Sequence, residues 1–556
     1  MATVREQVQE RFRAALESAQ RSGALPAPGD DSPAPTIEVV RPQQAEHGDF
    51  STNLALKLAG PLKRPPRQIA EALIGALGAG PDDELLARAE AAGAGFVNVW
   101  LEPAYLERAI DAIRANEQTY GEVRVSGPKR INVEFVSANP TGPLTVGNAR
   151  GAFVGDLLCR VLEAVGHEVT REYYFNDSGA QVEMLGLSIR AIRAGDEVPQ
   201  DGYHGDYVRD LAAIVPAEVL QQAEATPART GWILGEWASE RIRAGIEASL
   251  ERLGVRFDVW TSEQPLVDDG WVKRGVEQLR SAGHVYEQDG AVWFRSTAFG
   301  DDKDRVIFRS NGEPTYFAKD IGYLVHKFAR GFDELLYLWG ADHHGTIARL
   351  KNAAEALGFD RDAANVLLIA WVRFVRDGEE MSMSKRAGEF VTLDELLEEV
   401  GVDAARWSFA SRAPSTGIDF DIELARKQSA ENPVYYVQYA HARIASILRK
   451  AANEGVPVAD SLAGNLADDE VAMGLAKELL RLPDIVLDAA AERETQAITT
   501  FATELATKFH AYYRDRRVVD KDDPQTSAGR LALVDAVRIT LARSLGLLGI
   551  SAPESM

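Results

Sequence analysis

The sequence predicts a multidomain α/β protein, in which a parallel-sheet domain lies between an N-terminal α+β domain and a C-terminal all-α bundle. Two patterns support this prediction. Strand-like and helix-like stretches alternate after residue 130, as a parallel sheet requires, and only helical patterns follow residue 425. The length of 556 residues allows about three to four domains, and 46% hydrophobic with 26% charged residues is typical of globular proteins.

Residues 1–125 are expected to form the α+β domain, which closes at the Ser126-Gly127-Pro128 linker. A charged amphipathic helix is predicted from Val4 to about Gln20, and the four prolines of residues 24–36 indicate a loop. Further elements are predicted from hydrophobic spacing and from capping residues: strands at 37–40 and 96–101, and helices at 54–59, 66–77 and 103–116.

A strand, a Gly/Pro loop and a helix are predicted in succession at the start of the second domain. The β-branched and aromatic run 130–137 predicts the strand, and Asn139-Pro140 and Gly142-Pro143 are turn signals. An amphipathic helix is expected from Asn148 to Gly166. Loop N–H groups and the positive end of the helix dipole would point to the same place, which suits a phosphate. On this stretch alone, an ordinary βα turn is the simpler interpretation.

The second domain is expected to span residues 126–425, with an insertion at about 195–290, and the bundle to span 426–556. A strand at 168–175 and a helix from Ala180 continue the alternation, which is expected to resume after the insertion with strands at 305–308, 335–340 and 366–374. The bundle helices are predicted at 425–449, 470–482, 492–514 and 528–548.

Composition excludes several classes of protein. The net charge of −23 argues against a surface coated for non-specific nucleic-acid binding, although a local basic face remains compatible with it. A single cysteine, Cys159, cannot form an internal disulfide or a zinc site, which suits a reducing cytosol. No run of about 18 apolar residues and no signal peptide is found, so we expect a cytoplasmic protein without a membrane span.

Three stretches outside the first loop carry candidate chemistry. Lys385 and Arg386, in the loop Met381–Gly388, could stabilise a transferring phosphoryl group, although such pairs are usually solvated surface. The run Asp342-His343-His344 follows a buried strand, where α/β sheets hold ligands; adjacent histidines rarely converge on one ion, so ligand hydrogen bonding is preferred over a metal site.

The third stretch is Tyr316-Phe317-Ala318-Lys319-Asp320. If it opens a helix, Tyr316 and Asp320 share a face, and a ring beside a carboxylate suits a guanidinium. An ordinary surface pair at this spacing is the alternative. Glu134 and Asn139 frame the first loop and could add a carboxylate and an amide to the same pocket.

The order of these motifs resembles the class I aminoacyl-tRNA synthetases, whose catalytic domain is Rossmann-like. Within that class the chain resembles arginyl-tRNA synthetase over essentially its whole length. The resemblance rests on 134–150 and 316–320, on Gly48–Asn53, on the helix Asn432–Arg443, and on the ending Leu545–Glu554.

The resemblance implies an arginine–tRNA ligase that forms arginyl-adenylate from L-arginine and ATP with Mg²⁺, and then transfers arginine to the 2′-OH of tRNA(Arg). Members of the family generally need tRNA before they activate arginine. The N-terminal domain would contact the tRNA elbow and the bundle the anticodon stem-loop. We expect a monomer and no protein-bound structural metal.

The resemblance also assigns residues. Arginine would be held by Glu134, Asn139, Tyr316, Asp320 and His344. ATP would be bound by the HIGH-type loop Ala138, Asn139, Pro140, Thr141, Gly142, Pro143, Leu144, Thr145, Val146, Gly147 and Asn148, and by the KMSK-type loop Ser382, Met383, Ser384 and Lys385. Thr145, Asn148 and Lys385 would be catalytic.

Two departures from the family pattern affect the expected rate. Thr145 and Asn148 stand where the HIGH-type loop has histidines, and Ser382 replaces the first KMSK-type lysine. Neutral donors form weaker bonds to phosphate than cationic ones, by ~1–2 kcal/mol per site. Adenylation would then slow by about tenfold or more per site unless the pocket compensates. Some members without that lysine have one at the position of Gly142, which this chain lacks, so Lys385 should carry more of the burden.

Two alternatives remain. Another class I-like nucleotidylyltransferase would share both ATP loops, but it would not need the bundle. A catalytically weakened paralogue that only binds tRNA would explain Thr145 and Asn148, but it would have no need of the arginine pocket around Tyr316 and Asp320.

Overall fold

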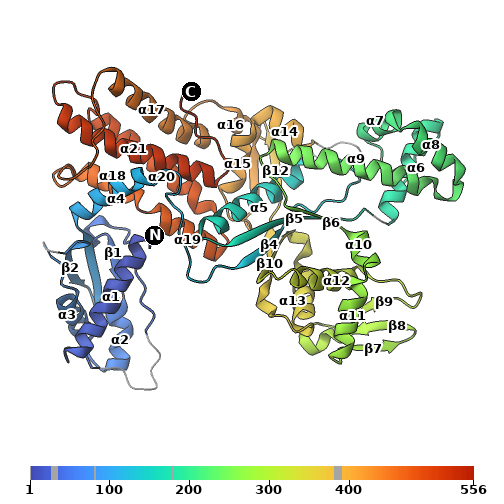
Figure 1. The fold of residues 1–556 in the computed structure, drawn as a ribbon, viewed down its shortest axis with the longest axis horizontal. Helices are drawn as coiled ribbons and strands as arrows, with labels where there is room; N and C mark the ends of the chain where they lie inside the picture. The colour runs from blue at the N-terminus through green and yellow to red at the C-terminus, as the bar shows by residue number, and fades with distance from the viewer. Residues whose placement is uncertain (1, 27–34, 81–82, 178, 381–390) are drawn as a thin grey trace.

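The computed structural model describes residues 2–26, 35–80, 83–177, 179–380 and 391–556. In Figure 1 the N-terminal unit lies against the C-terminal helical bundle, and the central sheet lies between this pair and a helical extension formed by α6 to α9. Among the described residues, the buried apolar side chains form a large cluster that joins the N-terminal unit, helix α5 and the bundle, and a smaller one around α11 to α13.

The N-terminal unit packs helices against a three-stranded antiparallel sheet of order β1-β3-β2. Its elements are α1 (Val4–Arg21), β1 (Phe50–Thr52), α2 (Leu54–Leu62), α3 (Pro66–Leu77), β2 (Leu86–Ala92), β3 (Phe96–Leu101) and α4 (Pro103–Ala115). The strand expected at 37–40 is wrong: only Val40 forms a bridge, to Ser51, because β1 offers just three residues for pairing. Strand β2 was not expected.

The central sheet contains five parallel strands in the order β11-β10-β4-β5-β6. These are β4 (Arg130–Glu134), β5 (Glu168–Phe175), β6 (Val259–Ser262), β10 (Glu334–Gly340) and β11 (Ala364–Ile369). The chain order reverses between β4 and β10, and open α/β sheets bind ligands at the carboxyl ends of strands at such a point. Helix α5 (Val146–Ala164) follows β4 and is buried along most of its length.

Four expectations for the catalytic-domain strands need correction. β4 ends at Glu134 rather than residue 137, because Val136 and Ser137 have φ of 67° and 44° and turn the chain out of the sheet. Strand β6 belongs to the main sheet although it lies inside the expected insertion. Residues 305–308 pair instead in a separate antiparallel sheet, and the run 366–374 splits between two sheets.

The connections between the main strands carry the remaining elements of the domain. Between β5 and β6 lie α6 (Ala180–Ala194), α7 (Asp206–Ile214), α8 (Ala217–Ala225) and α9 (Thr230–Arg252). Between β6 and β10 lie α10 (Glu263–Asp268), α11 (Trp271–Ser281), the antiparallel sheet β7 (Val285–Gln288), β8 (Ala291–Phe294) and β9 (Arg305–Phe308), and α12 (Tyr316–Ala329). After β10 come α13 (Ile347–Ala356), β12 (Val372–Arg376), β13 (Glu379–Glu380), α14 (Leu393–Val400), α15 (Val402–Ala410), β14 (Ile418–Asp421) and α16 (Ile422–Arg426).

The C-terminal bundle is all-α, as predicted. It consists of α17 (Pro433–Asn453), α18 (Glu470–Leu479), α19 (Leu482–Glu492), α20 (Gln496–Asp515) and α21 (Pro524–Leu547). The helix expected at 425–449 is two helices, because Pro433 starts α17 at the position where proline is favoured. Short 3₁₀ turns complete the chain at Ala45–His47, Pro227–Arg229, Ser296–Phe299, Ala341–Thr346 and Arg361–Ala363. In the described part of the chain, no helix has the length and apolarity to cross a membrane.

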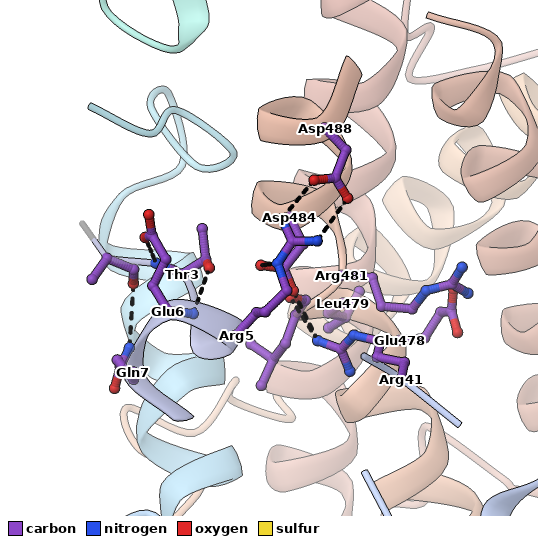
Figure 2. A network of polar contacts seen from close by, with 12 residues as sticks. Thr3, Arg5, Glu6, Gln7, Arg41, Glu478, Leu479, Arg481, Asp484 and Asp488 are labelled. Atoms are coloured by element: carbon purple, nitrogen blue, oxygen red, sulfur yellow. Dashed lines mark hydrogen bonds and ion pairs between the residues drawn. The ribbon is translucent and has the colours of Figure 1, made fainter. Parts of the chain in front are cut away.

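Ion pairs join the N-terminal unit to the bundle, as Figure 2 shows. Arg5 of α1 donates two hydrogen bonds to Asp488 of α19, with N–O distances of 2.8 and 2.6 Å. Arg41 reaches Asp484 of the same helix at 3.3 Å. The N-terminal unit is therefore fixed to helix α19 of the bundle.

Candidate active site

The carboxyl ends of β4 and β10 bring two of the predicted motifs to one edge of the sheet. Glu134, the last residue of β4, pairs in register with Tyr337 of β10. The loop 135–145 leaves β4 there, and β10 ends three residues later at Gly340, before the turn that contains Asp342, His343 and His344. This edge is where a doubly wound sheet binds its ligands.

The loop after β4 is held by side chains from other elements. The Tyr173 hydroxyl donates to the carbonyl of Ala138 at 2.9 Å and accepts from its N–H at 3.0 Å. The Tyr207 hydroxyl donates to the carbonyl of Thr141 at 2.8 Å. Residues with positive φ other than glycine carry strain of about 1–3 kcal/mol, so Val136 and Ser137 persist only because these contacts fix the loop.

The two residues that replace the expected histidines interact with each other at the start of α5. The backbone N–H and the hydroxyl of Thr145 both donate to Oδ1 of Asn148, at 3.1 and 3.2 Å. Thr145 is only 8% exposed. Among the described residues nothing pairs with Nδ2 of Asn148, so this amide is the donor left for a ligand at the helix N-terminus.

The chain returns to this loop directly after residues 381–390. Leu393 donates its N–H to Leu144 at 2.9 Å, and Val146 donates to Val391 at 3.2 Å. Thr145 and Thr392 form a β-bridge. The expected ATP residues Ser382, Met383, Ser384 and Lys385 lie outside the described residues.

Helix α12 presents a stripe of polar side chains along one face: Tyr316, Asp320, Tyr323 and Lys327. Tyr316 is 73% exposed at the start of the helix, whereas Lys327 is fully buried. The ammonium of Lys327 donates to Oε2 of Glu134 at 2.6 Å, which fixes α12 to the end of β4. The contact between Glu134 and α12 is made at Lys327 and not at Tyr316, while Asp320 lies close enough for the charge of Glu134 to act on it.

A second buried carboxylate, Glu172 of β5, stabilises the same region. It accepts hydrogen bonds from Asn132 and Thr261 at 2.6 Å and from the Tyr323 hydroxyl at 2.7 Å, and it pairs with Arg330. Burial raises the pKa of Glu172, but the charges of Lys327 and Arg330 outweigh burial and lower the pKa to about 2. Glu172 is therefore ionised at any physiological pH.

A third carboxylate, Glu263 at the start of α10, is also neutralised within the protein. It forms an ion pair with Lys319 of α12 and accepts a 2.5 Å hydrogen bond from the Tyr174 hydroxyl. The Lys319 ammonium lies 5.6 Å from the centre of the Tyr316 ring. The pair therefore joins α12 to α10.

Asp320 differs from these three carboxylates because, among the described residues, it has neither an ion pair nor a side-chain hydrogen bond. The residue is exposed at the surface. Desolvation of its carboxyl group and the charges of Glu134 and Glu263 nevertheless raise its pKa to about 7, against the opposing charge of Lys319. A cation that pairs with Asp320 would relieve this repulsion and keep the group ionised.

The remaining predicted arginine residues are placed differently. Asn139 donates from Nδ2 to Gln181 at 2.9 Å and accepts from the N–H of Asn176 at 3.4 Å, so both ends of its amide are engaged. His344 is exposed in the turn after β10, and its side chain makes no hydrogen bond to another described residue. His343 lies 3.6 Å from Asp342.

The sequence reasoning missed the cations of this site. Lys327, Lys319 and Arg330 were not singled out, and neither was Glu172. Part of the signal was available, because residues 316, 320, 323 and 327 follow helical spacing along one face. No group of three or more potential metal ligands is found among the described residues.

Models of three protein families match successive parts of the chain. The arginyl tRNA synthetase N terminal domain matches residues 6–101, the catalytic domain of class I tRNA synthetases (R) matches 109–201 and 236–415, and the DALR anticodon binding domain matches 437–556.

Relatives match over nearly the full length. The arginine–tRNA ligase of Moorella thermoacetica is 45% identical over 99% of both chains, and that of Geobacillus kaustophilus is 44% identical over 100% of this chain and 99% of its own. Among solved structures, Thermus thermophilus arginyl-tRNA synthetase is 25% identical with a TM-score of 0.76, covering 99% of this chain and 100% of that one. The arginyl-tRNA synthetase of Plasmodium falciparum, at 16% identity and a TM-score of 0.73, shares the fold over 100% of both chains.

Proposed function

Because this chain belongs to the arginyl-tRNA synthetase family, we infer that it is an arginine–tRNA ligase. The carboxylate of arginine attacks the α-phosphate of ATP and expels pyrophosphate. The ribose 2′-OH of tRNA(Arg) then attacks the arginyl carbonyl, and AMP leaves. ATP and its Mg²⁺ are substrates here, so the protein needs no metal site of its own. The observation that carries this inference is the match over nearly the full length at 45% identity.

We propose that the guanidinium of arginine pairs with Asp320 and stacks on Tyr316. An unpaired carboxylate beside an exposed ring offers both the bidentate hydrogen bonds and the π-face that a guanidinium prefers. Glu134 keeps lone pairs beyond its contacts with Lys327 and Ser137, and these can accept from the amino group of the substrate. A contribution from Asn139 requires it to exchange its present partners, and His344 is free to approach from the turn after β10.

The phosphates of ATP are proposed to lie at the N-terminus of α5. The loop 138–148 supplies backbone N–H groups, Asn148 supplies a side-chain amide, and Lys385 supplies the positive charge. Replacement of Lys385 by alanine should lower kcat far more than it raises the arginine KM, because the lysine acts on charge that develops in the transition state. An equal loss in arginine affinity would contradict this role.

We propose that tRNA(Arg) is contacted by residues 1–125 at its elbow and by residues 426–556 at its anticodon stem-loop. On α17, Tyr439 is 37% exposed, its ring centre lies 6.5 Å from that of Tyr435, and Arg443 approaches it to 5.3 Å. Exposed rings beside an arginine suit unstacked bases. We also propose that the enzyme acts as a monomer in the cytoplasm.

Charging of purified tRNA(Arg) with labelled arginine tests this function. We expect charging that requires ATP, together with ATP–pyrophosphate exchange that requires both arginine and tRNA. A paralogue that only binds tRNA would retain tRNA without charging it, and a nucleotidylyltransferase of another kind would not charge it at all. Either result with folded protein would contradict the proposal.

A further inference from the structure

The ammonium of Lys327 is buried against Glu134, one of the residues proposed to bind arginine. Its Nζ lies 2.6 Å from Oε2 of Glu134 and 4.4 and 4.1 Å from the ring centres of Tyr323 and Tyr337. Its side chain is 0% exposed, and that of Glu134 is 7% exposed. A charge this deeply buried needs a partner, so the pair fixes the two groups relative to each other.

The pair connects two elements that are far apart in the sequence. Glu134 ends β4, and Lys327 lies near the end of α12, whose first turns carry Tyr316 and Asp320. The proposed contacts to the two ends of arginine therefore come from elements that Lys327 fastens together. Lys327 itself has no exposed atoms with which to touch a substrate.

The charges of the pocket can be paired one to one. Glu134 pairs with Lys327, Glu172 with Arg330, and Glu263 with Lys319. Within the described part of the chain, Asp320 is the carboxylate of this group without a counter-ion. A guanidinium would bring the positive charge that Asp320 lacks beside it.

We propose that Lys327 is a positioning residue of the arginine site, which holds Glu134 in place and balances its charge, so that the guanidinium of the substrate can pair with Asp320. This inference rests on the proposed binding of arginine at Asp320. Lys327 acts through Glu134 and not by contact with the substrate.

The charge of Lys327 has a measurable consequence for Asp320. The groups that act on Asp320 are Glu134 from β4, Glu263 from α10 and Lys319 from its own helix, while the phenols of Tyr174 on β5 and Tyr337 on β10 stay protonated because burial raises their pKa. Without Lys327, the buried Glu134 would have no cation beside it, and burial would favour its neutral form. The negative charge that Glu134 exerts on Asp320 would then be lost, so Asp320 would ionise at lower pH, and Glu134 would no longer be held in place.

The test is arginine affinity between pH 5.5 and 9, measured by calorimetry on the full-length protein with tRNA(Arg) present, together with KM and kcat for charging. In the Lys327→Met variant, we expect the midpoint of the pH profile to fall by about one unit, and arginine affinity at high pH, where Asp320 is ionised in both proteins, to fall about tenfold because Glu134 is no longer held in place. At high pH and saturating arginine, kcat should change much less than KM.

A matched control is Arg493→Met. Arg493 donates to the buried Glu334 at 2.9 Å, at the amino end of β10 and thus at the opposite edge of the same sheet. This variant also loses a cation from a buried glutamate, but it should leave the pH midpoint of arginine binding unchanged. A Lys327→Met profile that matches the Arg493→Met profile would show that Lys327 is merely structural, and would overturn the proposal.

Two further variants decide the matter even if Lys327→Met does not fold. Glu134→Gln removes a negative charge beside Asp320, so the midpoint should fall below the wild-type value. Because Lys327 acts through Glu134, the double variant Glu134→Gln/Lys327→Met should keep the midpoint of Glu134→Gln. If the second substitution moves the midpoint further, Lys327 acts on Asp320 other than through Glu134, and the proposal fails.

The Asp320→Asn variant separates this inference from the proposed function. If arginine affinity and its pH dependence are unchanged in Asp320→Asn, the proposed binding of the guanidinium is wrong, and this inference falls with it. If that variant loses affinity as expected while Lys327→Met behaves like Arg493→Met, only the role of Lys327 is wrong.

Discussion

The proposed arginine site and the proposed ATP site lie at the same edge of the sheet, as two halves of the active site, but their side chains are arranged for their ligands in different ways. In the proposed arginine half, charged side chains neutralise one another in pairs across β4, β5, α10 and α12, and one carboxylate, Asp320, has no partner among the described residues. In the proposed ATP half, short neutral side chains bind each other, and one amide, that of Asn148, has no partner in the described part of the chain. In each half, the group without a partner is the one available to the ligand, and its neighbours fix the geometry.

The largest effect is expected for Asp320→Asn. The substitution keeps the shape of the side chain but removes the charge that a guanidinium would balance. Charge-assisted hydrogen bonds contribute ~1.5–3 kcal/mol, so arginine affinity should fall about 100-fold. Calorimetry with the full-length protein measures this directly, and an affinity within twofold of wild type would mean that the arginine half is organised around another group.

The pH dependence of arginine binding gives the next largest effect. Asp320 binds a guanidinium only when ionised, and its pKa in the free enzyme is raised to about 7. As pH falls below that value, the group is protonated and affinity should drop by about tenfold per unit, whereas above it affinity should level off. A flat profile from pH 5.5 to 8 would show that no titrating carboxylate faces the substrate.

In the ATP half, Asn148→Ala should lower kcat for adenylation by about tenfold, which corresponds to the ~1–1.5 kcal/mol of one neutral hydrogen bond made in the transition state. The arginine KM should stay near its wild-type value, because this side chain lies in the other half of the site. Pyrophosphate exchange measures both constants. A rise in arginine KM without a fall in kcat would reverse the assignment of the two halves.

The smallest effect is expected for Thr145→Val. The Thr145 hydroxyl donates to Asn148 at 3.2 Å and its residue is buried, so we propose that it orients Asn148 and does not bind phosphate. We expect kcat to fall by no more than about threefold, with about 1 kcal/mol lost in stability from the start of α5. A loss of kcat as large as that of Asn148→Ala would show that both residues contact ATP.

Several features of both sites could be predicted from local sequence patterns. The strand–loop–helix unit around residues 130–165 and the shared face of Tyr316 and Asp320 follow from residue spacing, and the structure contains both. The all-α end of the chain was equally clear from periodicity. Local spacing is sufficient for these features because each is contained within one or two adjacent elements.

Features that depend on distant partners could not be predicted in this way. Four of the residues 86–92 are alanine, which disfavours strands, yet the segment pairs with β3 because tertiary context overrides propensity. The four-residue strand β6 gains its place in the sheet only from pairing with β5. Likewise the Glu134–Lys327 pair joins residues 193 positions apart, and no local pattern specifies which buried charges will meet.

The central claim is that the arginine half lacks one positive charge and that Asp320 is where it is missing. L-Citrulline has nearly the shape of arginine, but its side chain carries no charge. A comparison of the two ligands therefore isolates the contribution of the guanidinium charge to binding. We predict that the wild-type enzyme binds arginine at least about 100-fold more tightly than citrulline at pH 8, and that Asp320→Asn reduces this preference to about tenfold or less. A preference for arginine that is the same in both proteins would contradict the account.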